Sequence, residues 1–349
     1  MSLPRVTAVI TCFNYGRFVS EAIESVLSQG LSPSELEVVV VDDGSTDDTP
    51  DRVRQFDGRI TSVRKPNAGQ ASALNAGFAN ARADIVALLD ADDVWLPGKL
   101  ARTLAAFEHN SRAVMVQHAR IVWFTDSGRV ETEPPPPPLS RSFPPSADDL
   151  LRYGPTATSA LAFRKSLLGS LLPIPVVLTG HADSYLSALA VLKGAVISLE
   201  DPLTKYRVHG GNLYSFADPD QSRAARRLEQ MQTFVRELDR ELSVQRRGFC
   251  GKGLDGYLER FHLIEEALRF ATQGAGRAEL FRHLRKHLRV YGSLWTRRYR
   301  SYRWLMSYVG LLLGYRNFEA LRRRYAGSSA PLLMRRNLFP AELLGSHST

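Results

Sequence analysis

Cysteine is scarce in this sequence, which has only Cys12 and Cys250 among its 349 residues. The two are far apart, and neither belongs to a Cys-x-x-Cys or Cys/His spacing, so a disulfide framework and a zinc site of the usual spacing are excluded. The start of the chain also lacks the charged head and the apolar core of about 7 to 15 residues that a secretory signal needs. We therefore expect a protein of the reducing cytoplasm.

Long hydrophobic runs are missing as well. The run from Trp304 to Gly314 comprises eleven residues and is bracketed by Arg303 and Arg316, whereas spanning a bilayer takes about 20 residues. Aromatic and basic residues cluster around this run, which is typical of a helix that lies in a membrane interface. A helix packed against the other domain has the same pattern, and both interpretations stay open.

The net charge of +9 is unevenly distributed along the chain. Residues 213–349 hold 25 Lys and Arg against 13 Asp and Glu, a net charge of +12, while residues 1–212 hold 20 against 23, a net charge of −3. Such asymmetry favours an anionic partner for the C-terminal part, with a membrane surface, a charged polymer and nucleic acid as candidates. A solvated helical surface is the plainer alternative.

Short apolar runs and amphipathic segments alternate over the first hundred residues. Three runs rich in β-branched residues predict buried strands: Val6–Thr11, Leu36–Val41 and Ile85–Leu89. Predicted helices cover 20–29, a stretch that begins near Asp47, and 70–82. The second of these helices has Ser45 and Thr46 as its expected caps. This alternation predicts an α/β fold with a parallel sheet and helices on both faces.

Polar residues follow each of the three predicted strands. They are Thr11 to Tyr15, Asp42 to Ser45, and Asp90 to Asp93. Because the carboxyl ends of parallel strands share one edge of the sheet, where ligands bind in such folds, we expect the three clusters to converge on one site.

The acidic cluster has the character of a metal site. Alternate residues of an extended segment point the same way, so Asp90 and Asp92 can address one ligand. Carboxylates are preferred by hard cations such as Mg²⁺ and Mn²⁺, which commonly bridge the charges of a nucleotide diphosphate. On spacing alone, an acidic loop that caps the helix expected after Pro97 is the alternative.

Proline marks the middle of the chain. Five prolines run from Pro134 to Pro138, and Pro144 and Pro145 follow. Proline is unfavourable in helices and central strands, so we expect an extended surface loop, with a ligand for an SH3-type domain as the alternative. After Asn212 the pattern becomes helical and Arg-rich, and we place a domain boundary there.

Taken together, three segments resemble family 2 glycosyltransferases: 40–47, 67–77 and 85–97. The resemblance implies the GT-A fold, a mixed, mainly parallel sheet flanked by helices, with a helical C-terminal region. It also implies inversion of configuration at the anomeric carbon of the transferred sugar. It assigns residues 1–212 to the GT-A domain, with 1–110 as the nucleotide-sugar binding half and 111–212 as the acceptor half, followed by a basic helical region at 213–349.

By this resemblance, six residues would bind the nucleotide-sugar: Thr11, Phe13, Tyr15, Asp42, Asn67 and Asp90. The Phe13 ring would stack on the base and the Asp42 carboxylate would pair with an imide N–H, so a UDP-sugar is the first expectation. The metal, Mn²⁺ or Mg²⁺, would be held by Asp90, Asp92 and His209. Asp93 is expected to orient the loop, and Asp43 either contacts the ribose or caps the turn.

An inverting transfer needs a base that removes the proton of the acceptor hydroxyl. Residues 181–186 resemble the family's base motif, which places Asp183 in the catalytic position. Ala182 stands where family members often have Glu, and Asp183 has an alternative role as a helix residue favoured by the dipole. The pair Asp148 and Asp149 is a second acidic candidate that resembles a helix start.

These observations predict an inverting, metal-dependent glycosyltransferase that moves a sugar to a hydroxyl of a glycan or lipid-linked acceptor. A nucleotidyltransferase and a Rossmann dehydrogenase are disfavoured because residues 11–16 contain no glycine cluster. The remaining alternative is a non-catalytic protein of the same fold that binds membrane or polyanion through its basic C-terminal region. We expect no nucleic-acid partner and a cytoplasmic location, and a peripheral position at the inner face of the plasma membrane stays open.

Overall fold

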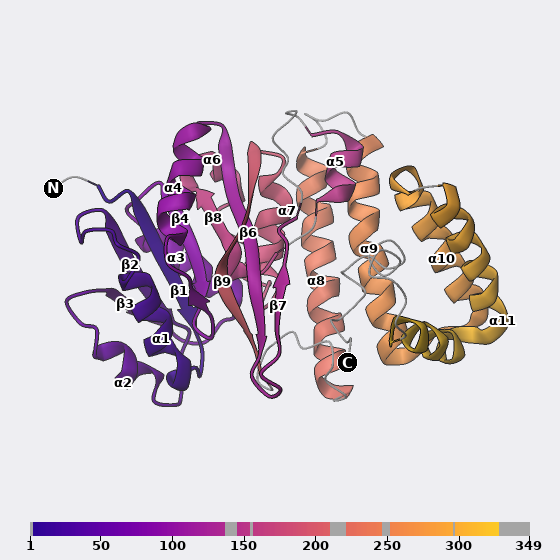
Figure 1. Cartoon of the computed structure of the whole chain (residues 1–349), viewed down its shortest axis with the longest axis horizontal. Coiled ribbons are helices and arrows are strands. Elements are labelled where there is room, and N and C mark those ends of the chain that lie inside the picture. The colour runs from indigo at the N-terminus through magenta and orange to yellow at the C-terminus, as the bar shows by residue number, and fades with distance from the viewer. Residues whose placement is uncertain are drawn as a thin grey trace. The chain divides into compact units, whose positions relative to one another are not determined.

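The computed structural model describes residues 3–136, 145–153, 156–209, 221–245, 252–295 and 297–327. The chain divides into two compact units, one of residues 1–212 with 236–249 and one of residues 213–235 with 250–349. A long helix, α8 (Gln221–Gln245), contributes to both units (Figure 1). The functions that the sequence assigns to 1–110, 111–212 and 213–349 stay predictions.

A nine-stranded sheet is the centre of the first unit, in the order β3-β2-β1-β4-β8-β6-β9-β5, with β7 paired to β6. The strands are β1 (Val6–Cys12), β2 (Leu36–Asp42), β3 (Thr61–Arg64), β4 (Ile85–Asp90), β5 (Val94–Trp95), β6 (Ala113–Phe124), β7 (Val130–Glu133), β8 (Leu161–Arg164) and β9 (Ala195–Val208). β1, β2, β3 and β4 pair in parallel, β8 runs antiparallel to β4 and β6, and β6 pairs in parallel with β9. The expected mixed sheet is therefore confirmed.

Helices flank this sheet. They are α1 (Gly16–Leu27), α2 (Thr49–Arg54), α3 (Gln70–Asn80), α4 (Lys99–His109), α5 (Ala147–Arg152), α6 (Lys165–Leu168) and α7 (Ala182–Ala190), with 3-10 turns at η1 (Thr158–Ala160) and η2 (Gly169–Leu171). The expected caps of α2 are wrong. Asp48 occupies the N-cap position, without a capping hydrogen bond from its side chain, and Ser45 and Thr46 hydrogen-bond to Asn14 instead.

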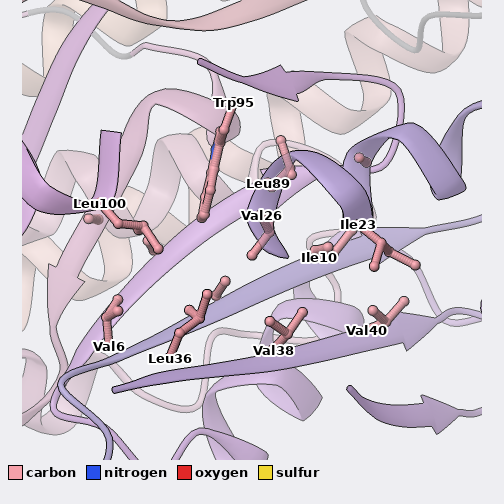
Figure 2. Close-up of a cluster of buried hydrophobic side chains, with 14 of the residues drawn as sticks. Val6, Ile10, Ile23, Val26, Leu36, Val38, Val40, Leu89, Trp95 and Leu100 are labelled. Carbon is pink, nitrogen blue, oxygen red and sulfur yellow. The ribbon is translucent and has the colours of Figure 1, made fainter. Parts of the chain in front are cut away.

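The core between α1 and the sheet explains why these runs fold as they do. Every residue of β2 is buried, both its four consecutive valines and the residues on either side of them, because both faces of the strand are covered. Ile23 and Val26 of α1 face Ile10 and Val38 of the strands (Figure 2). Burying each such side chain contributes about 1.5–3 kcal/mol, which makes this layer the rigid support of the strand ends.

The second unit is helical, as the sequence predicts. It contains α9 (Lys252–Gln273), α10 (Arg277–Tyr291) and α11 (Arg297–Gly327), with a 3-10 turn, η4 (Gly292–Leu294), before α11. The backbone of α11 breaks at Gly314, where φ is 73° and ψ is 170°. Of the residues described, none belongs to a helix that is both long and apolar enough to cross a membrane.

The predicted proline loop is only partly described. Pro136 accepts hydrogen bonds from the side chains of Gln117 and Ser198, at 3.2 and 2.6 Å. Pro137, Pro138 and Pro144 lie outside the described residues, so the structure does not test the predicted loop there.

Candidate active site

Three strand ends meet in register at one edge of the sheet. Thr11 of β1 pairs with Asp90 of β4, and Cys12 pairs with Asp42 of β2. The hydroxyl of Thr11 donates to Oδ1 of Asp90 at 3.3 Å. The three polar clusters that follow these strands therefore lie together.

Hydrogen bonds connect the loop after β1 to the loop after β2. Asn14, in the left-handed conformation with φ of 58°, donates its N–H to Oγ of Ser45 at 2.8 Å and accepts from the N–H of Thr46 at 2.8 Å. The N–H of Tyr15 donates to Oγ1 of Thr49 at 3.0 Å. Phe13 on this loop is 43% exposed, so it is not a core aromatic.

Asp42 presents a buried acceptor. Its Oδ1 accepts from the N–H of Ser45 at 2.8 Å. Its Oδ2 lies 3.3 Å from Nε of Arg64 yet has no hydrogen-bond partner. Because a buried carboxylate oxygen without a donor costs free energy, a ligand N–H that reached this atom would be bound favourably.

Asp43 makes the contacts expected of a residue that caps the turn, and its contact with the ribose stays a prediction. It accepts from the N–H groups of Ala68 and Gly69, the latter at 2.8 Å, and forms an ion pair with Lys65. Asn67 is exposed on the turn thus held. Gly44 is required here, since its φ is +82° and a Cβ would lie 2.6 Å from the N of Asn67.

The start of α3 is joined to the segment before α7. The N–H groups of Gln70 and Ala71 donate to the carbonyls of Thr179 and Leu178, at 3.2 and 3.1 Å. Gly69 permits this approach, because a Cβ there would lie 2.7 Å from Cα of Thr179. The side chain of Gln70 accepts from the N–H of Ala182 at 2.9 Å.

The acidic cluster is crowded with like charges. Burial and the charges of Asp92 and Asp183 raise the pKa of Asp90 to about 8. Burial, Asp92 and Asp90 raise the pKa of Asp93 well above its usual range. Asp93 has structural partners, accepting from Oγ of Ser159 at 2.5 Å and from the N–H of Arg207 at 2.8 Å. A cation at this cluster would relieve the repulsion among the carboxylates.

His209, the residue directly after β9, lies beside the acidic cluster. Its Nε2 lies 3.2 Å from Oδ2 of Asp92, and its Nδ1 lies 3.3 Å from Arg17. The Tyr15 ring packs edge-on against it, 5.9 Å between centroids. Burial, Asp92 and Asp90 raise the pKa of the Tyr15 phenol, which keeps its proton and hydrogen-bonds to Asp92.

The donor chemistry of these residues fits a hard divalent cation. Asp92 and His209 are adjacent buried donors of oxygen and nitrogen, and Asp90 lies in the same cluster. Within the described ranges, no three His, Cys, Asp or Glu side chains are grouped so as to hold a metal ion on their own. Mg²⁺ and Mn²⁺ sites are commonly completed by substrate phosphates, so two protein donors agree with such a site. The three-residue set of Asp90, Asp92 and His209 stays a prediction.

Asp183 lies in the first turn of α7, after His181 in the left-handed conformation. The hydroxyl of Thr158 donates to its Oδ2 at 2.9 Å and also hydrogen-bonds to Asp90. Ala182 is fully buried and carries no carboxylate, so Asp183 is the one acidic residue in the first turn of α7. The other acidic pair is structural at Asp149, which forms a capping box with Ser146.

The 3-10 turn η1 supports the acidic cluster through hydrogen bonds. The sequence analysis did not predict this role. Oγ of Ser159 accepts from the N–H of Asp90 at 3.0 Å while donating to Asp93. Its carbonyl accepts from Nζ of the fully buried Lys99 at 2.7 Å. Burial lowers the pKa of Lys99 well below its usual range, and its Nζ also lies 2.8 Å from Nε2 of His118. Small polar residues without a motif gave no signal for this role.

A family model described as glycosyl transferase family 2 matches residues 7–168 of the chain. The chain is similar to an uncharacterized glycosyltransferase of Nostoc sp., with 36% identity over 217 residues, 60% of this chain and 66% of that one. It is 38% identical to the succinoglycan biosynthesis protein ExoU of Rhizobium meliloti over 104 residues, 29% of this chain and 30% of that one. The chain thus covers less than two thirds of the length of these relatives.

Solved structures share the fold. TarS of S. aureus, residues 1–349, has been solved with UDP and with UDP-GlcNAc, and it superposes with a TM-score of 0.58 at 16% identity over 92% of each chain. The mannosyltransferase PcManGT of Pyrobaculum calidifontis, in complex with GDP-Man and Mn²⁺, gives a TM-score of 0.54 at 20% identity over 93% of this chain and 85% of that one. The GT-A fold expected from the sequence is therefore confirmed.

Proposed function

We propose that this chain, whose residues 7–168 match the model of glycosyl transferase family 2, is an inverting, metal-dependent glycosyltransferase. It would move a sugar from a UDP-sugar to a hydroxyl of a glycan or lipid-linked acceptor. One observation carries the proposal: the Thr158 hydroxyl bonds to Asp183 at 2.9 Å and also to Asp90. The candidate base and the candidate donor site thus share a hydrogen-bonding group.

The nucleotide is proposed to lie at the ends of β1 and β2. Phe13 offers an exposed ring for stacking, and Oδ2 of Asp42 offers a buried acceptor for the imide N–H of uracil. Thr11, Tyr15 and Asn67 border the same edge. UDP is our first choice for this reason, although a structural relative binds GDP-Man.

Asp92 and His209, with Asp90 beside them, would hold Mn²⁺ or Mg²⁺ together with the donor diphosphate. The cation would neutralise charge on the departing diphosphate. The buried carboxylates and the 3.2 Å approach of His209 to Asp92 support this assignment.

Asp183 is the proposed general base. Its carboxylate would take the proton of the acceptor hydroxyl as that oxygen bonds to the anomeric carbon, while the bond from this carbon to the diphosphate oxygen breaks on the opposite face. Hydrogen bonds from Thr158 at 2.9 Å and from the N–H of Ser184 at 2.7 Å fix its orientation. A fixed carboxylate is what proton removal in line with attack requires.

The test is Asp183→Asn, with Asp148→Asn as the control carboxylate. We expect Asp183→Asn to bind UDP with Mn²⁺ as the unaltered protein does, measured by calorimetry, and to lose transfer by about 10²–10⁴-fold. Asp148, exposed at the start of α5, should tolerate the change. Retained turnover in Asp183→Asn would assign the base to another carboxylate. Failure of the protein to bind any nucleotide-sugar with Mn²⁺ or Mg²⁺ would leave the non-catalytic alternative.

A further inference from the structure

The first half of α11 exposes large apolar side chains to solvent. Trp304, Leu305, Tyr308 and Leu312 are 49%, 56%, 39% and 72% exposed. We call these four residues the α11 apolar face. The rings of Trp304 and Tyr308 lie 4.7 Å apart, so the face is continuous there. Single exposed apolar residues are ordinary, but a contiguous group of this kind marks an interaction surface.

Helix geometry separates this face from the packed side of α11. Arg303, Ser307 and Gly310 are buried, and a Cβ on Gly310 would lie 2.9 Å from Cδ1 of Leu284 in α10. At 3.6 residues per turn, positions 304, 305, 308 and 312 lie together on the opposite side of the helix. The packed side therefore accounts for most of the attachment of α11. The ring of Tyr308 also packs edge-on against Phe281 of α10, 5.2 Å between centroids, so Tyr308 is left over only on its exposed side, whereas Trp304, Leu305 and Leu312 remain exposed.

Arginine dominates the charges along this part of α11. Residues 296–318 contain five arginines and no Asp or Glu, and Glu319 is the one acidic residue in the sequence of α11. Arg297, Arg300 and Arg316 are exposed, and Arg297 lies on the same side of the helix as Tyr308. A surface that combines apolar and aromatic residues with arginine alone is complementary to acidic phospholipid, whose headgroups are anionic and whose chains are apolar.

A second copy of the chain fits this face poorly. A two-fold dimer brings the same patch of both copies together, so the arginines of one copy would approach those of the other. The segment has no carboxylate to pair with them. Like charges brought together in this way oppose association.

We infer that the α11 apolar face and its flanking arginines form a docking surface for a bilayer of acidic phospholipid. The helix would lie in the plane of the interface, with Trp304, Leu305, Tyr308 and Leu312 below the headgroups and Arg297 and Arg300 among the phosphates. This inference does not depend on the proposed catalytic function, because the residues belong to the second unit and the test involves no nucleotide-sugar.

The test is flotation of the full chain with phosphatidylcholine vesicles, with and without phosphatidylglycerol. We expect binding to the anionic vesicles alone, and weaker binding as salt is raised. Arg297→Gln with Arg300→Gln should lower the partition coefficient about 30-fold, since each basic residue at an anionic surface contributes about fivefold. Leu305→Gln with Leu312→Gln should lower it by at least about tenfold.

Two matched pairs serve as controls. Arg226→Gln with Arg240→Gln removes two exposed arginines of α8, and Val176→Gln with Val177→Gln removes two exposed apolar residues before α7. Both pairs should bind as the unaltered protein does. Thermal unfolding checks that every variant is folded, and tryptophan fluorescence gives a second measurement: it should shift to the blue with anionic vesicles, and Trp304→Phe should lose the shift.

Several results would overturn the inference. They are equal binding to neutral and anionic vesicles, no binding to either, unchanged binding of the α11 variants, or equal losses in the control pairs. Light scattering that finds a dimer for the unaltered protein and a monomer for Leu305→Gln with Leu312→Gln would assign the face to a second copy instead.

Discussion

Asp92 and His209 lie 117 positions apart in the chain, and their side chains meet, with Nε2 of the imidazole 3.2 Å from Oδ2 of the carboxylate. His209 directly follows β9 and Asp92 lies in the loop after β4, so the contact joins the two halves of the sheet. Both side chains are buried. A cation held between them and a diphosphate would therefore connect both halves to the donor.

Removing either partner should weaken metal binding with UDP. We expect Asp92→Asn and His209→Gln each to lower the affinity for Mn²⁺ in the presence of UDP by at least about tenfold. Thermal unfolding measures this without turnover, because Mn²⁺ that binds the folded state raises the melting temperature. His109→Gln, at an exposed histidine, is the control. The same Mn²⁺ titration in all four proteins would contradict the assignment.

Ser159→Ala should destabilise the protein. The change removes the hydrogen bond to Oδ2 of Asp93 and the acceptor for the N–H of Asp90, both in the interior. Leaving such groups without partners costs about 1–3 kcal/mol of unfolding free energy, measurable by urea denaturation.

Ser166→Ala is the matched control for this change, since Ser166 makes an exposed hydrogen bond to Asp84 at 3.0 Å. Its cost should stay within about 0.5 kcal/mol. Equal costs for the two variants would show that η1 is not a support of the acidic cluster.

Stability without metal should fall as pH rises through the range set by Asp90. Burial and the charges of Asp92 and Asp183 raise the pKa of Asp90 to about 8 in the folded state, from an ordinary value of 3.8. Between these values the folded state keeps a proton that the unfolded chain has lost, so the contribution of Asp90 is complete below about pH 4 and is lost as pH rises to about 8.

Asp90→Asn removes this titration, so in EDTA it should gain stability relative to the unaltered protein as pH rises. Urea unfolding at a series of pH values measures the difference. Asp84→Asn, at an exposed carboxylate, should follow the unaltered protein. A parallel pH dependence for Asp90→Asn and the unaltered protein would be inconsistent with a raised pKa at this position.

Strand order made part of the site predictable. Thr11, Asp42 and Asp90 end adjacent parallel strands, and the register places such ends at one edge whatever the rest of the chain does. No comparable rule of sheet topology predicts the positions of Asp183 and His209. Their positions depend on the path of the second half of the chain, and only the family resemblance singled them out.

The support of the site could not be read from the sequence. Ser159 and Lys99 act through hydrogen bonds between residues 60 or more positions apart, and no local spacing encodes such a contact. The error at Ser45 and Thr46 has a related cause. Both were expected to cap α2, but Asn14 on another loop is the partner they find. Local propensity gives way where a tertiary partner competes for the same hydroxyl.

The close approach of Gly69 to Thr179 has a consequence for the timing of the reaction. Two main-chain hydrogen bonds join helix α3 to the segment that leads into Asp183. With Asp183 as the proposed base, these bonds would tie its position to that of the nucleotide loops before either substrate arrives. A clamshell motion between the two would have to break both bonds.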